Sequence, residues 1–157
     1  MGPFAITPLD AARLRRALTE LDSSDPARAA RVRRRARESA ARLARDYPGD
    51  TAARVLAEES PAEDEPCPAL DPETLTCDLY AARPITCRAF GPPVRFGDES
   101  LAICELCFHG ATDAEIAACE VAIDPGNLEG ELLREFPPRD TIVAFALVEA
   151  ECHPNQS

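Results

Sequence analysis

Five cysteines within 41 residues constrain the fold of this chain more than any other feature of its sequence. They are Cys67, Cys77, Cys87, Cys104 and Cys107, with the spacing C-x9-C-x9-C-x16-C-x2-C. A C-x2-C pair chelates well because one tight turn can point both sulfurs at the same ion. Thiolate is a soft ligand that suits zinc or an iron-sulfur cluster rather than magnesium or calcium. The spacing therefore predicts a zinc or iron-sulfur centre, with these five cysteines as its candidate ligands.

Other interpretations of the cysteines stay open. Reduced cysteines are common core residues, and "CELC" at 104–107 has the spacing of a thiol redox pair. The opening residues "MGPFAITPLD" do not have the pattern of a signal peptide, so we expect a cytoplasmic protein. In that compartment clustered cysteines bind metal more often than they form disulfides. The total of seven cysteines, an odd number, also disfavours a complete disulfide framework.

Charged and stiff residues surround the third cysteine of the cluster. Arg83 and Arg88 flank Cys87 and are candidates to offset thiolate charge or to donate hydrogen bonds to sulfur. The alternative is that Arg83 pairs with an acidic residue. Pro84 disfavours helix at the residue before it, so we expect a sharp turn that presents Cys87 toward Cys77.

Two further residues with metal-binding side chains receive other interpretations. His109 follows Cys107 closely and could complete a site, although an exposed or hydrogen-bonded histidine is the commoner outcome. Cys119 shares a predicted helical face with Ile116 and Ile123, which indicates a core thiol.

Capping residues and prolines mark the starts of the predicted helices. Thr7 with Pro8, and Asp25 with Pro26, each combine an N-cap with a proline at the first helical position. These signals and the apolar spacing predict helices over 8–22, 26–47, 51–59, 113–122 and 128–136, and a strand over the β-branched, apolar residues 141–148.

Together these elements predict an α+β fold. We expect one small, mostly helical domain over 1–157, with one or two short strands and a loop-rich middle stapled by the metal. Its parts are N-terminal helices over 1–59, the cysteine region over 67–109, and C-terminal helices and a strand over 112–148.

Charge is divided unevenly along the chain and limits the choice of partners. The net charge is −11, but residues 1–54 contain 12 arginines against 7 acidic residues. We expect the basic helices to pack along the acidic remainder, and we do not expect nucleic-acid binding. No run of 18 apolar residues is present, which argues against a membrane span. The sequence does not identify a partner.

The segment "CPALDPETLTCDLYAARPITCRAFG" resembles the pattern "CPFL…C.IY..RP..CR.F" of the YkgJ-like cysteine cluster proteins, zinc- or iron-chelating domains of the CxxCxxCC type. The resemblance covers about 67–107. It implies that Cys67, Cys77 and Cys87 are metal ligands and that Cys104 and Cys107 join them. Some relatives occur in proteins linked to flagellin lysine methylation, where an iron-sulfur centre is suspected.

The chain departs from this family in one respect. The CxxCxxCC run that gives the family its name lies near the N-terminus of relatives, whereas no cysteine precedes Cys67 here. The opening "MGPFAITPLDAARL" resembles the stretch that follows that run. We therefore expect that this chain starts late relative to its relatives and has a reduced set of ligands.

Three functions are compatible with these observations. The sequence favours a metal-binding module without catalysis of its own, because it contains neither a Gly-rich phosphate loop nor a helical His-x-x-x-His pair. The second hypothesis is an iron-sulfur enzyme in methyl-transfer or redox chemistry. The third is a thiol redox protein that uses Cys104 and Cys107.

Overall fold

Helices make up most of this α+β fold, as the sequence predicts. The computed structural model describes residues 2–57, 61–97, 99–100, 103–104 and 107–148. The helices are α1 (Pro8–Ser24), α2 (Pro26–Asp46), α3 (Thr51–Val55), α4 (Ile85–Ala89), α5 (Asp113–Ala118), α6 (Leu128–Leu133) and α7 (Val143–Val148), with short 3-10 turns η1 (Pro61–Asp64) and η2 (Tyr80–Ala82). Among the described residues, none of these helices has the length and apolar character needed to cross a membrane.

The capping signals of the first two helices are confirmed. The Thr7 hydroxyl accepts the backbone N–H of Asp10 at 3.2 Å, and the Asp25 carboxylate accepts that of Arg28 at 3.0 Å. Each interaction satisfies an amide that has no partner within the helix. Pro8 and Pro26 are the first residues of α1 and α2. Farther along, Thr112 and Glu115 form a capping box at the start of α5.

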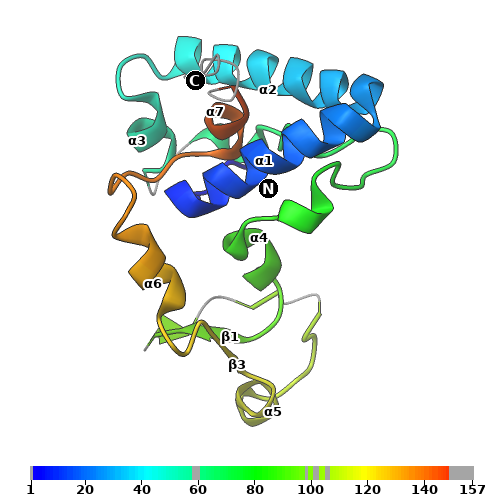
Figure 1. Ribbon diagram of the computed structural model, residues 1–157. Coiled ribbons are helices and arrows are strands. Elements are labelled where there is room, and N and C mark those ends of the chain that lie inside the picture. The colour runs from blue at the N-terminus through cyan, green and yellow to red at the C-terminus, as the bar shows by residue number, and fades with distance from the viewer. Residues whose placement is uncertain (1, 58–60, 98, 101–102, 105–106, 149–157) are drawn as a thin grey trace.

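The main core lies where α1, α2 and α7 pack against one another (Figure 1). Its side chains are mostly small aliphatic groups, consistent with an aromatic content of only 5%. The residues buried where these helices meet include Leu14, Leu18, Val32, Ala36, Ala146 and Leu147. We call α1, α2, α7 and the segment 61–90 the helical body.

The predicted strand at 141–148 is wrong. Thr141 pairs with Ile6 in an isolated antiparallel bridge, and the chain then enters α7. All six residues of α7 are apolar, and four of them are buried, so the helix has no polar face. A short run that is apolar on all sides has no helical periodicity, and its β-branched residues then indicate a strand. Packing against α1 and α2 overrides that local preference.

Residues 91–136 form an outer region that lies beside the helical body (Figure 1). It contains the strands β1 (Val94–Phe96), β2 (Glu99–Ser100) and β3 (Val121–Ile123), in the order β2-β1-β3. β1 is antiparallel to β2 and parallel to β3. The outer region also contains α5 and α6.

Two predictions in the outer region are wrong. The helix expected to reach about residue 122 ends at Ala118, because Val121–Ile123 pairs with β1 instead. Cys119 is consequently exposed rather than a core thiol. The helical face that it was expected to share with Ile116 and Ile123 does not form, since Ile123 is in a strand.

Candidate metal centre

A hairpin-like turn brings Cys67 and Cys77 onto neighbouring strands of backbone. Leu70 and Cys77 form an antiparallel bridge, and the N–H of Asp78 donates to the carbonyl of Ala69 at 2.8 Å. At the tip, the N–H of Asp71 donates to the carbonyl of Thr76 at 2.9 Å. The two cysteines are therefore juxtaposed by backbone pairing, although nine residues separate them in sequence.

Backbone amides point at both of these sulfurs. Burial raises the pKa of the Cys67 thiol, while the N–H groups of Ala69 and Leu70 act against that shift. Burial likewise raises the pKa of Cys77, opposed by the N–H of Leu79. Such donors stabilise a thiolate and tune the sulfur ligands of metal centres. Both side chains are half-buried and pack against the main core.

The third sulfur is close enough to interact with the first two. Burial, together with the negative neighbours Cys67 and Cys77, raises the pKa of Cys87 to about 11. Arg83 acts in the opposite direction by charge and by a hydrogen bond to the Cys87 side chain. We call Cys67, Cys77 and Cys87 the thiol triad. The predicted turn toward Cys77 is consistent with this proximity.

Arginines also fix the backbone around Cys87. Arg83 donates to the carbonyl of Cys87 and lies over the ring of Tyr80, 5.4 Å from its centroid. Arg88 donates to the carbonyls of Arg83 at 3.0 Å and of Ala81 at 2.8 Å. The two arginines therefore interact with sulfur and main-chain carbonyls, and Arg88 acts as a clamp on the turn.

A buried carboxylate holds the start of the helix that carries Cys87. Asp10 of α1 accepts the N–H of Ile85, the first residue of α4, at 3.0 Å. Arg13 donates to its other carboxylate oxygen at 3.2 Å. Burial raises the pKa of Asp10 despite these two donors. This contact places α4 against the N-terminal end of α1.

We call residues 61–90 the triad segment, and three arginines of α2 hold it against this helix. Arg28 and Arg35 both form ion pairs with the buried carboxylate of Asp78, next to Cys77. Arg35 also donates to the carbonyl of Pro68, next to Cys67, at 2.9 Å. Two helical turns farther along α2, Arg42 forms an ion pair with Glu65 at 2.8 Å. The basic helix therefore packs along acidic residues, as its charge predicts.

These anchoring residues were not predicted, although the sequence contains a signal for them. Arg28, Arg35 and Arg42 recur every seven residues, which places them on one face of a helix. An acidic residue, Asp78, directly follows Cys77. Sequence alone does not pair them, because 43 and 50 residues separate Asp78 from its two arginines.

Cys104 and Cys107 form a separate pair in the outer region. The N–H of Cys107 donates to the carbonyl of Cys104 at 3.0 Å, which closes a turn. A hydrogen bond with Cys104 raises the pKa of Cys107. The N–H of Cys104 donates to the carbonyl of Gly91 at 3.1 Å, just after the segment that carries Cys87. The sequence predicts that these two cysteines bind the metal, and this stays a prediction.

Among the described residues, no three His, Cys, Asp or Glu side chains converge closely enough to hold a metal ion as they stand. The triad nevertheless has the donor chemistry that zinc or iron needs, with three neighbouring thiols that receive amide and guanidinium donors. Binding would require the sulfurs to close on the ion and lose their protons. His109 is exposed and lies outside this group.

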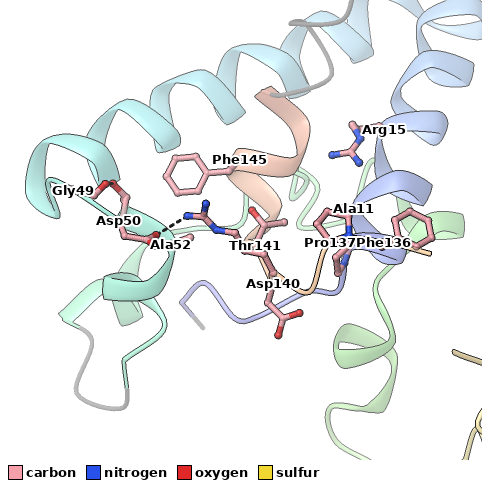
Figure 2. A pocket seen from close by; sticks show the side chains of 13 residues that line it. Ala11, Arg15, Gly49, Asp50, Ala52, Phe136, Pro137, Asp140, Thr141 and Phe145 are labelled. Atoms are coloured by element: carbon pink, nitrogen blue, oxygen red, sulfur yellow. Dashed lines mark hydrogen bonds and ion pairs between the residues drawn. The ribbon is translucent and has the colours of Figure 1, made fainter. Parts of the chain in front are cut away.

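Two cavities differ in their relation to the sulfurs. A groove of about 750 Å³ between α2 and the triad segment includes Cys67, Arg31 and Arg35 in its lining, so solvent reaches this side of the triad. A second cavity, of about 430 Å³, is lined from α1, the start of α3 and the segment before α7 (Figure 2). Asp50 and Arg139 form an ion pair of 2.8 Å at its edge, and no cysteine lines it.

Three neighbouring, partly buried thiols on a helical scaffold make this a cysteine-rich α+β protein. The model of the CxxCxxCC family, described as "Putative zinc- or iron-chelating domain", matches residues 11–107. The chain belongs to this family. The matched residues include α2, the whole triad and the pair Cys104–Cys107. Comparisons with curated proteins and with solved structures gave no match.

Proposed function

We propose that this protein binds one zinc or iron centre through the thiolates of Cys67, Cys77 and Cys87. The observation that carries the proposal is their mutual interaction within a segment that α1 and α2 hold in place. Family membership supports zinc or iron chelation in general and does not identify the ligands. An activity beyond chelation is not part of the proposal.

The electrostatics of the triad explain why a cation belongs there. Burial raises the pKa of all three thiols, and neighbouring thiols add to the shift at Cys67 and Cys87, which favours the protonated form without a metal. A bound cation compensates the thiolate charges, and its binding releases protons, so affinity should increase with pH. Three thiolates leave one position of a tetrahedral ion for a further donor or water.

Metal analysis of the full chain tests this proposal. We expect one zinc or iron per chain after purification without oxygen, and we expect Cys77→Ser to lose it. Cys119→Ser is the matched control, because Cys119 is exposed and outside the triad. Equal metal content in the two variants would contradict the proposal. Visible absorbance would identify an iron-sulfur cluster, whereas a colourless protein with zinc would identify a simple ion.

A further inference from the structure

The pair Cys104–Cys107 has a backbone geometry that suits a disulfide. Its hydrogen bond from the N–H of Cys107 to the carbonyl of Cys104, at 3.0 Å, spans four residues. A turn of this kind holds its first and last Cα atoms within about 7 Å. Disulfides join Cα atoms separated by about 4.4–6.8 Å. The two side chains also share a hydrogen bond, which places the sulfurs beside each other.

The two sulfurs differ in their access to solvent. Cys107 is exposed, whereas Cys104 is half-buried. The backbone of Cys104 is held by the carbonyl of Gly91, and Ile103 forms a parallel bridge with that glycine. An external disulfide can react at the exposed sulfur of Cys107, and the half-buried sulfur of Cys104 can then displace the reagent from Cys107.

We propose that Cys104 and Cys107 form a reversible disulfide by exchange with a small-molecule disulfide such as oxidised glutathione, separately from the metal-binding triad. Two observations favour separation. The triad lies in a segment that ion pairs from Arg28 and Arg35 hold against α2, whereas the pair lies in a turn of the outer region that backbone hydrogen bonds hold. The inference goes beyond metal binding and does not need it.

The exchange has two balanced steps. The Cys107 thiol loses its proton to solvent, and its sulfur attacks one sulfur of oxidised glutathione, which releases one glutathione thiolate. The Cys104 thiol then loses its proton and attacks the Cys107 sulfur, which releases the second. The protein is oxidised by two electrons and two glutathione molecules are formed. An excess of reduced glutathione reverses both steps.

A comparison with Cys119 tests the proposal. Cys119 is exposed like Cys107, but no described thiol interacts with it. The full-length, zinc-loaded protein is treated with oxidised glutathione, its remaining thiols are alkylated, and its peptides are identified by mass spectrometry. We expect a disulfide between Cys104 and Cys107, and a stable glutathione adduct on Cys119. Removing the resolving sulfur in Cys104→Ser, with Cys104→Ala as a second variant, should leave glutathione on Cys107.

Zinc content is measured on the same samples. Retention of zinc while the disulfide forms would support two separate sulfur sites. The proposal would be overturned by persistent glutathione on Cys107 in the unsubstituted protein, or by release of zinc in step with the disulfide. The second result would make the pair part of the metal centre. If the protein holds no zinc at all, the proposed metal function fails, while the peptide readout still decides the fate of the pair.

Discussion

The helical body and the outer region bury their side chains to very different extents. The body contains most of the buried hydrophobic residues, around α1, α2 and α7. In the outer region, the buried residues among those described are only Gly91, Pro93, Val94 and Glu129, while Phe96, Val121 and Leu132 are exposed. In Figure 1 the outer region extends away from the three packed helices, and α6 leads back toward them.

The two sets of sulfurs follow this difference. The thiol triad lies on the helical body, where ion pairs and core packing hold its segment. Cys104 and Cys107 lie where few side chains are buried, and backbone hydrogen bonds hold them. A ligand site needs fixed positions, whereas a thiol pair that exchanges with a reagent needs access. The comparison therefore supports different roles for the two sets.

The largest expected effect is on the core of the helical body. Leu147 of α7 is 0% exposed, and Leu147→Ala should lower the free energy of unfolding by about 2–5 kcal/mol. Leu132→Ala, at a position that is 50% exposed in α6, should change it by about 0.5 kcal/mol or less. Denaturant titration of both variants measures the difference. Similar losses would mean that the outer region contributes a core of its own.

The second prediction concerns the attachment of the triad to α2. The Asp78 side chain is 1% exposed and pairs with Arg28 and Arg35, so Asp78→Asn should cost about 2 kcal/mol and weaken zinc binding. Asp22→Asn breaks an ion pair with Arg33 in which Asp22 is 46% exposed, and should change the free energy of unfolding much less. Competition with a chromogenic chelator measures zinc affinity. If Asp78→Asn left the affinity for zinc unchanged, the ion pairs of Asp78 would not be needed to position the metal site.

Local signals were sufficient for the parts of the fold that depend on neighbouring residues. Thr7 and Asp25 cap α1 and α2 as predicted, because a cap and its amide lie three residues apart. The turn before Cys87 follows from Pro84, which keeps Arg83 extended at ψ 132°. The resemblance in 67–107 also indicated the family that the chain belongs to.

Long-range contacts explain what the sequence did not predict. α7 is helical because α1 and α2 surround it, and Val121–Ile123 is a strand because β1 offers a partner. The contacts of Asp78 with α2 and of Asp10 with Ile85 join residues more than 40 positions apart. No local pattern specifies such partners, and they are the contacts that position the triad.

A third prediction tests the junction between the two regions. Gly91 has φ +115°, where a residue with a Cβ is strained, and its carbonyl accepts the N–H of Cys104. Gly91→Ala should therefore cost about 1–3 kcal/mol and slow formation of the Cys104–Cys107 disulfide. Gly97→Ala is the control, at φ +59° with open space around it, where the cost should be about 1 kcal/mol. Equal disulfide rates in the two variants would show that Gly91 does not position the pair.

The smallest effect should come from Glu129, the buried residue through which α6 contacts the helical body. Thr7 donates to its carboxylate at 3.1 Å, but burial raises the pKa of Glu129, and Asp10 and Asp124 raise it further. The folded state then holds the proton more tightly than the unfolded state does. The stability from the protonated form is present below the unfolded pKa of about 4.3 and is lost as pH rises through the raised folded value.

Glu129→Gln removes this dependence while keeping an oxygen that can accept the Thr7 hydroxyl. Relative to the unsubstituted protein, its free energy of unfolding should increase as the pH rises across that range. The control is Glu131→Gln on the exposed side of the same helix. Denaturant titrations at several pH values measure both. If the difference in the free energy of unfolding for Glu129→Gln did not vary with pH, α6 would contact the helical body without burying a charge. The two regions would then be joined less tightly than the Thr7 contact indicates.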